Sequence, residues 1–311
     1  MDGDRKPRRW RPSPSATVVG SAVAMVCAAW GAGAASGGWL GQALRSPRML
    51  VYGGMALASG VGLYLIGGVM FRLGRSRTRP GATDGTSAIE FVLLFPWALI
   101  LALLMIQSTM LVSQNVVLHY SAYAAARAAV VWVPEKLSYE EPRNVVTDPS
   151  YSEKVRHIRM AAVMVLTGVS ANKPGVGGSG GAGDSSLHQA AYERLYSLYA
   201  EPIPGWINRM YPHKYQYAQK FTEVDLVPPR VAPAYGAHED LTVTVRHTLY
   251  LGVPYARRIF SWDEDGRDLG NGEYGTAAEA TCTLTNHGVE DEIDVEVFPR
   301  YVGRGEEEEP G

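Results

Sequence analysis

Residues 84–97 read Asp-Gly-Thr-Ser-Ala-Ile-Glu-Phe-Val-Leu-Leu-Phe-Pro-Trp, and they open a long uncharged stretch of the chain. From Phe91 to Ala126 there is no Asp, Glu, Lys or Arg. About 20 apolar residues are enough for a helix to cross a bilayer, and the alanine-rich continuation favours helix beyond it. The sequence therefore predicts one long helix over residues 86–133. We expect a helix kink at Pro96, because proline lacks the amide that the helix would use there.

The head of this helix has a first interpretation that needs only local structure. Ser87 and Glu90 stand three residues apart in front of an apolar run, as in a capping box. In that arrangement the two side chains satisfy free amides in the first turn of the helix. On this interpretation Glu90 has no role beyond capping.

The second interpretation rests on a wider pattern. Gly85 is followed five residues later by Glu90 and then by Phe91, which resembles the prepilin-peptidase signature of type IV pilins and pseudopilins. With Pro96 and the small-residue stretch 121–130, the segment resembles the TadE-like family of Tad (Flp) pilus assembly. The resemblance is good over residues 80–135 and loose over residues 240–288.

The resemblance implies a processing site and a role for Glu90. In that family the bond after the glycine is cut by a prepilin peptidase, and the following helix anchors a small extracytoplasmic domain. Carried over, the cut falls between Gly85 and Thr86, and Glu90 and Phe91 are recognition positions. A lone carboxylate is costly inside a bilayer. The family likeness implies the freed amine of Thr86, on the same or an adjacent subunit, as its partner.

Two further stretches are long enough to span a bilayer, Ser13–Leu44 and Met49–Phe71. In the second, Gly53, Gly60 and Gly67 recur every seven positions, and small residues at such spacing let membrane helices approach closely. We expect these two stretches to pair with each other as a transmembrane hairpin over residues 13–71. Met70 offers an alternative start that would leave a short arginine-rich leader, and the sequence leaves the choice open.

The charges are distributed unevenly along the chain. Residues 1–85 carry a net charge of +8 and the remainder carries −10, although the whole chain has 29 basic and 31 acidic residues. Positive residues gather on the cytoplasmic side of membrane proteins. We therefore expect the basic tail 1–12 and the leader-like segment 72–85 to be cytoplasmic, and the C-terminal domain to be extracytoplasmic. The resemblance implies the bacterial inner (cytoplasmic) membrane. An acidic outer domain argues against nucleic acid as a partner.

Residues 134–300 predict an α+β extracytoplasmic domain, followed by an acidic tail at 301–311. Helical spacing of apolar residues indicates helices around 155–165 and 187–198, whereas the aromatic stretch 202–217 contains prolines and predicts an irregular loop. Alternating apolar residues predict strands. We expect strands at 241–251, 275–284 and 293–297, in an antiparallel sheet with helices on one face and water on the other.

Residues that could carry chemistry are scattered. The seven histidines show no metal-ligand spacing. His247 lies on the apolar side of its strand, which favours a core histidine, and His238–Asp240 reads as a solvated turn. The glycine pattern at 175–180 lacks the strand that a dinucleotide site requires. The serines at 197 and 261 lie in no nucleophile motif, and Cys27 and Cys282 are not expected to pair. We expect no enzyme activity, no cofactor and no metal.

These observations favour a membrane-anchored, TadE-like minor pseudopilin or assembly component that acts by helix packing. Its expected partners are membrane lipid, other pilins or pilus-assembly subunits, and a prepilin peptidase. An uncleaved three-span scaffold whose hairpin docks an assembly platform is the alternative. A membrane-tethered binding or hydrolase domain is the third interpretation.

Overall fold

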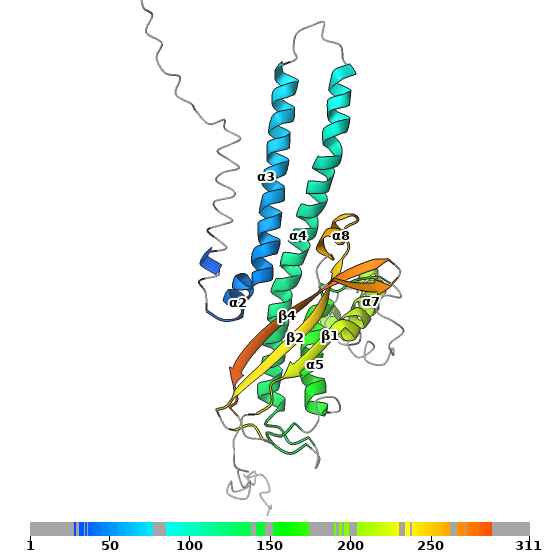
Figure 1. Ribbon diagram of the computed structural model, residues 1–311. Coiled ribbons are helices and arrows are strands. Elements are labelled where there is room, and N and C mark those ends of the chain that lie inside the picture. Colours follow the sequence, from blue (N-terminus) through cyan, green and yellow to red (C-terminus); the bar gives the residue numbers. More distant parts are fainter. Residues whose placement is uncertain are drawn as a thin grey trace, which may run out of the picture.

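A computed structural model describes residues 28, 31–33, 35, 37–76, 85–137, 141–146, 152–173, 190, 193–194, 196–198, 204–229, 234–236, 238–261, 266–270 and 272–287. Within these residues the chain forms two long helices that rise together from a small domain of helices and strands (Figure 1). The combination of helices with a small antiparallel sheet is the predicted α+β class.

The first described elements are a short helix, α2 (Trp39–Arg45), and a long one, α3 (Pro47–Ser76). Ser46 separates them: it ends α2, and its hydroxyl accepts a hydrogen bond from the amide of Met49 at 3.3 Å. Proline is favoured at the first position of a helix, since its missing amide is not needed there. The Ser46-Pro47 pair therefore stops one helix and starts the next.

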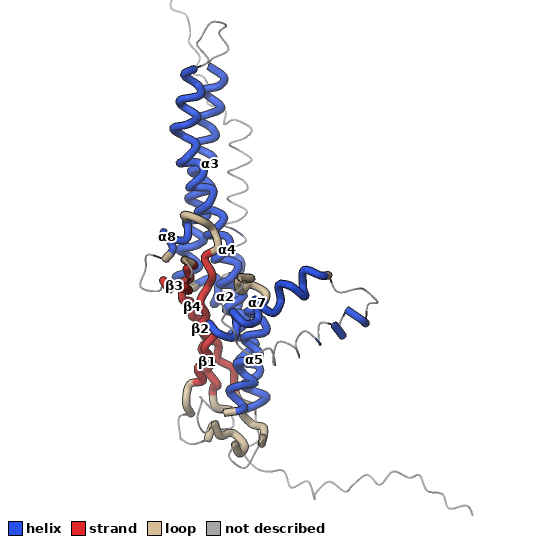
Figure 2. The backbone as a smooth tube through the Cα atoms, turned by 90° about the vertical axis from the view of Figure 1, so that its right-hand side faces the viewer, coloured by secondary structure: helices blue, strands red, loops and turns tan. Residues whose placement is uncertain are grey.

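Helix α4 (Gly85–Trp132) runs antiparallel to α3 over most of the length of α3 (Figure 2). A Cβ placed on Gly60 would lie 3.8 Å from the sulfur of Met105, and one on Gly62 would lie 3.1 Å from a methyl of Leu101. Close approach at Gly60 agrees with the sequence prediction, and the described helix that packs there is α4. Pairing of α3 with the first predicted span stays a prediction, because residues 13–27, 29, 30, 34 and 36 of that span lie outside the described residues.

In the part of the chain that the structure describes, two helices are long and apolar enough to cross a membrane, over Pro47–Val69 in α3 and Phe91–Trp132 in α4. Large apolar side chains remain exposed along both of them where they extend beyond the domain. On α4 these are Phe91, Val92, Leu93, Phe95, Trp97, Leu99, Ile100 and Ile106, and on α3 they are Val61, Leu65 and Val69. Such a surface is what a lipid environment would cover.

The domain contains a four-stranded antiparallel sheet in the order β1-β2-β4-β3. Its strands are β1 (Thr222–Leu226), β2 (Asp240–Leu251), β3 (Gly266–Gly270) and β4 (Glu273–Thr285). The predicted strands at 241–251 and 275–284 are confirmed as β2 and β4, which pair along their whole length. β1 and β3 were not expected from the sequence, and the predicted strand at 293–297 lies outside the described residues.

The core lies between one face of this sheet and two helices, the second half of α4 and α5 (Glu153–Thr167). Helix α4 contributes Leu111, Leu118, Ala122, Ala125, Ala126 and Ala129 to it, and Val133 directly follows the helix. The hydrophobic core therefore includes residues of the long helix that precede the boundary expected near Pro134. The opposite sheet face is polar, with threonine pairs such as Thr242–Thr283 and Thr244–Thr281 bonded across the strands.

The stretch 202–217, for which we expected an irregular loop, is mostly helical. Helix α7 (Gly205–Phe221) starts after Pro204 and continues through Pro212. Its buried face carries Tyr215, Tyr217 and Ala218. Packing of this aromatic face overrides the low helix propensity of an internal proline, so the sequence interpretation was wrong here.

A buried lysine ties the end of α4 to the loop that follows it. Lys154 is fully buried, and its ammonium donates hydrogen bonds to the carbonyl oxygens of Val133 (2.8 Å), Pro142 (2.7 Å) and Val145 (3.0 Å). Burial lowers the pKa of Lys154, whereas the carboxylate of Glu141 opposes that shift. The last carbonyls of a helix need such donors.

We expect Lys154→Met to lower the free energy of unfolding by about 3–5 kcal/mol, because three buried carbonyls lose a charged donor at once. Urea unfolding of the detergent-solubilised chain measures this. Lys214→Met is the matched control. Lys214 donates one bond, to the carbonyl of Gly168 at 2.7 Å at a more exposed position, so a loss within about 1 kcal/mol is expected. Equal effects of the two variants would contradict the capping role.

Candidate functional site

The segment that carries the expected processing site forms the first turns of α4. The backbone is helical from Gly85, so Gly85 and Thr86 lie at the very start of the helix. Ser87 lies inside the first turn rather than at the position before the helix, where a capping box would place it. The side chains from Gly85 to Glu90 lie outside what the structure describes, so the pairing of Glu90 stays a prediction.

Phe91 is the first side chain of the segment that the structure describes. It is 55% exposed and lies beside Phe95, with ring centroids 5.5 Å apart. Pro96 follows inside α4, and the helix continues through it without interruption. The kink expected there stays a prediction. Phe91 and Phe95 present a continuous apolar surface next to the predicted cut.

The domain meets α4 at Gln107, close to the end of the densest run of exposed apolar side chains, although Met110 is still 42% exposed. Gln107 is fully buried, and its side-chain oxygen accepts a hydrogen bond from the amide of Val253 at 2.9 Å. Val253 leads into the short helix α8 (Ala256–Phe260). The Phe260 ring meets Tyr52 of α3 edge-on, with centroids 6.1 Å apart. Helices α3, α4 and α8 thus come together at the base of the hairpin.

Polar contacts also join α4 to α2 and α3. The Asn115 amide, which is buried, donates to the hydroxyl of Ser46 at 3.1 Å. Tyr120 of α4 lies against Trp39 of α2, with ring centroids 5.2 Å apart. These contacts were missed from the sequence. The available signal was the seven-residue spacing from Ser108 to Asn115, which places polar groups on one side of an otherwise apolar helix.

Helix α4 is thus a long apolar helix with an exposed first half and a second half built into an α+β domain, which is the arrangement expected for the long helix from the sequence. The comparison with protein families agrees: residues 85–127 match the model of the family described as TadE-like protein. The likeness of this segment to that family is therefore established, from the first residue of α4 to Arg127. No curated protein and no solved structure matches the chain.

The histidine singled out from the sequence is buried in the core, as predicted. His247 is 3% exposed, and its Nδ1 lies 2.9 Å from the hydroxyl of Thr222. Burial lowers its pKa to about 4. The imidazole is thus neutral near pH 7 and contributes to packing. His238 is exposed in a turn that Glu239 closes by accepting a bond from the amide of Gly236 at 2.8 Å.

The lowered pKa of His247 predicts a stability that depends on pH. The unfolded chain takes up this proton below about pH 6.5, whereas the folded chain resists it down to about pH 4. Stability is therefore full above pH 6.5 and falls as the pH drops through this window, by up to about 3 kcal/mol. His247→Leu should destabilise the folded state mildly and remove this pH dependence. Thermal unfolding curves recorded between pH 4 and pH 7 would measure both effects. His238→Leu should leave the pH dependence unchanged.

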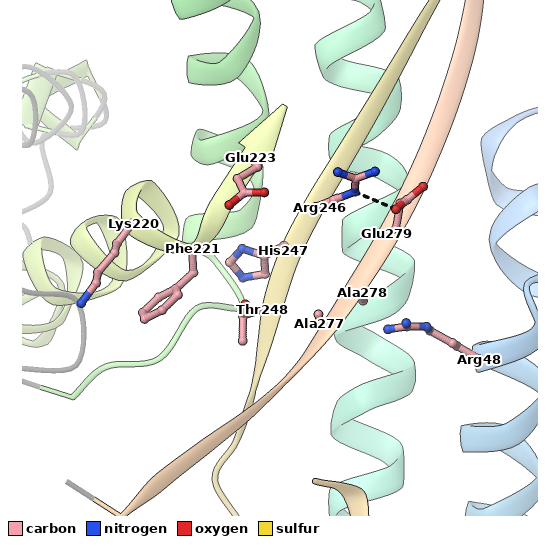
Figure 3. A pocket seen from close by; sticks show the side chains of 10 residues that line it. All are labelled: Arg48, Lys220, Phe221, Glu223, Arg246, His247, Thr248, Ala277, Ala278 and Glu279. Carbon is pink, nitrogen blue, oxygen red and sulfur yellow. Dashed lines mark hydrogen bonds and ion pairs between the residues drawn. The ribbon is translucent and has the colours of Figure 1, made fainter. Parts of the chain in front are cut away.

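A cavity of about 310 Å³ opens beside this histidine (Figure 3). In the figure, Arg246 of β2 and Glu279 of β4 are joined across the strands, Lys220 and Phe221 lie on one side, and Arg48 extends from α3 on the other. The whole lining is Arg48, Lys220, Phe221, Glu223, Arg246, His247, Thr248, Ala277, Ala278 and Glu279.

Among the residues that the structure describes, no group of His, Cys, Asp or Glu is placed to hold a metal ion. Cys282 is buried, and burial raises the pKa of its thiol.

Proposed function

We propose that this chain is a membrane-anchored, TadE-like minor pseudopilin or assembly component of a Tad (Flp)-type pilus or secretion system. It acts by lateral packing of α4 against other subunits and has no catalysis of its own. The observation that carries the proposal is the match of residues 85–127 to the TadE-like family, because that segment covers the exposed first half of α4 and most of the half that is built into the domain. A prepilin peptidase cuts after Gly85, and Glu90 sets the register of packing by pairing with a Thr86 amine.

Topology is the first test of the proposal. Arginines at 72, 75, 77 and 79 lie at or just beyond the end of α3, away from the domain, so this end is cytoplasmic and the domain is outside. A reporter such as alkaline phosphatase fused after Gly311 should be active, because it works only outside the cytoplasm. The same reporter inserted near Thr78 should be inactive. A cytoplasmic C-terminus would overturn both the orientation and the pseudopilin function.

The uncleaved three-span scaffold is a second candidate function, and one observation favours it. Helix α3 packs along the same half of α4 that would enter a filament. If the chain stays uncut, the two helices form a permanent hairpin that docks an assembly platform. If the chain is cut after Gly85, α3 must be displaced or remain bound without a covalent link. Analysis of the mature N-terminus separates these cases.

The third interpretation, a tethered hydrolase or binding domain, would need a convergent cluster of histidines and acids. The described residues bring no such cluster together. His247 is hydrogen-bonded to the hydroxyl of Thr222, and the exposed rings of His238 and His287 have their centroids 6.5 Å apart. We therefore propose structural function alone for the domain.

A further inference from the structure

We propose that α8 and the turn before it form a membrane-surface contact. Tyr255 and Ile259 enter the headgroup region of the bilayer, and Arg258 binds lipid phosphates. The contact fixes how close the domain sits to the membrane. This inference rests on the proposed function, because it requires the first half of α4 to be in the membrane.

The level of α8 along the hairpin is the first argument. The exposed apolar residues of α4 run from Phe91 to Met110, a segment of 20 residues or about 30 Å of helix, which is close to the thickness of the hydrocarbon core. Gln107, three residues before the end of this segment, accepts the amide of Val253 at the start of the α8 turn. If the exposed apolar segment fills the membrane, α8 lies at its edge.

The exposed side chains of α8 are the second argument. Tyr255, the residue before the helix, is 77% exposed, and Ile259 within the helix is 47% exposed. Arg258, between them in sequence, is exposed as well. Tyrosine is enriched at membrane interfaces, and arginine extends its charge toward the headgroups. This is the composition of an interfacial segment.

The backbone at Tyr255 is the third argument. Its φ angle is +63°, in the left-handed region that residues other than glycine seldom adopt. Such a conformation costs on the order of 1–3 kcal/mol and persists only where neighbouring structure holds it. The conformation turns the chain sharply after Val253 and leaves the aromatic ring outside the domain.

The inner side of α8 is fastened to the domain, whereas its outer side is exposed. Ala256 is buried, and Arg257 lies 3.5 Å from the carboxylate of Glu273 and over the ring of Tyr274. Glu273 also accepts a hydrogen bond from Tyr250 at 2.6 Å and pairs with Lys173. This network holds α8 rigidly, so Tyr255 and Ile259 are presented in a fixed place.

Lipid is favoured over a protein partner because the surface is continuous with the hairpin. The exposed apolar residues of α4 run from Phe91 past the α8 contact at Gln107 to Met110. The proposal rests on this continuity and on the tyrosine, and not on net charge, since the acidic residues 263–265 follow α8 in the sequence.

Site-directed spin labelling of the full chain in vesicles of phosphatidylethanolamine and phosphatidylglycerol tests the proposal. Cys27→Ala and Cys282→Ala remove the native thiols, and single labels are placed through Tyr255→Cys and Ile259→Cys. Leu99→Cys, at a site 44% exposed on α4, is the reference for lipid. Val227→Cys is the reference for water, because Val227 is 49% exposed and lies far from α8. The amide of Val227 donates a hydrogen bond to the carbonyl of Thr242, which is nine residues, or about 30 Å, along β2 from Leu251.

We expect the labels at 255 and 259 to be accessible to oxygen and shielded from a water-soluble nickel complex, at a depth between the two references. Arg258→Glu should raise nickel access at 259 severalfold, whereas Arg156→Glu, on an exposed side chain of α5, should not. Labels at 255 and 259 as accessible to nickel as the label at 227, with the label at 99 in lipid, would overturn the inference alone. Shielding from both oxygen and nickel would overturn it in favour of a protein contact. A label at 99 exposed to water would overturn the proposed function as well.

Discussion

A fragment that begins at Pro134 should fail to form a stable folded domain, although it contains the whole sheet. The reason is that one side of its core is supplied by α4 and the residue that follows it, through Leu111, Leu118, four alanines and Val133. Each large apolar side chain contributes about 1.5–3 kcal/mol when buried, and the total stability of a small domain is only about 5–15 kcal/mol. We expect a broad, non-cooperative thermal transition by circular dichroism and poor dispersion of amide protons.

The matched control for this fragment begins at Gln107 and retains the second half of α4. It restores the missing side of the core and the bond from Val253 to Gln107. We expect a sharp unfolding transition and mixed helix and strand content. If the fragment from Pro134 unfolds as cooperatively as the longer one, the second half of α4 is not part of the core.

The second large effect concerns Gly85 and Glu90. Gly85→Trp should block processing, because a large side chain crowds the bond after residue 85. Gly68→Trp is the control, since Gly68 lies exposed on α3 with open space around its Cβ position. Immunoblots of membranes should show only the longer form for Gly85→Trp and the shorter form for the control.

Glu90→Ala should separate capping from pairing. Loss of a capping residue costs about 0.5–2 kcal/mol and would leave assembly nearly intact. Loss of a carboxylate paired with a Thr86 amine in low dielectric leaves an uncompensated charge, at a cost of about 3–5 kcal/mol, and should impair assembly even where cleavage proceeds. Glu135→Ala, at an exposed position after α4, should have no effect. Normal assembly of the Glu90→Ala variant would leave capping as the sufficient role.

The elements with clean periodicity could be predicted from the sequence. β2 alternates apolar and polar residues over its whole length, and α5 has apolar residues at helical spacing with Ser152 accepting a bond from the amide of Val155. Strands β1 and β3 were not predicted, because each has only five residues, too few to show a clear alternation, and β3 contains two glycines. Helix α7 was not predicted, because the prolines in its sequence indicated a loop although its aromatic residues form one buried face.

The candidate site could be predicted in part, since its motif residues are adjacent in sequence whereas its packing is not. Periodicity shows which face of a helix is small or apolar, but it does not show which helix packs there. This is why the contact of α3 with α4 at Gly60 and Gly62 was not predicted. Gln107 and Asn115 lie in an apolar run, and their partners, Val253 and Ser46, are far away in the chain.

The mature N-terminus of the membrane-bound protein tests the central claim most directly. Mass spectrometry or Edman sequencing of the protein purified from producing cells should find a chain that begins at Thr86. That result would establish α4 as a processed pilin-type helix. An intact N-terminus before Gly85 in functional complexes, together with a silent Gly85→Trp substitution, would contradict the claim and leave the uncleaved three-span scaffold in its place.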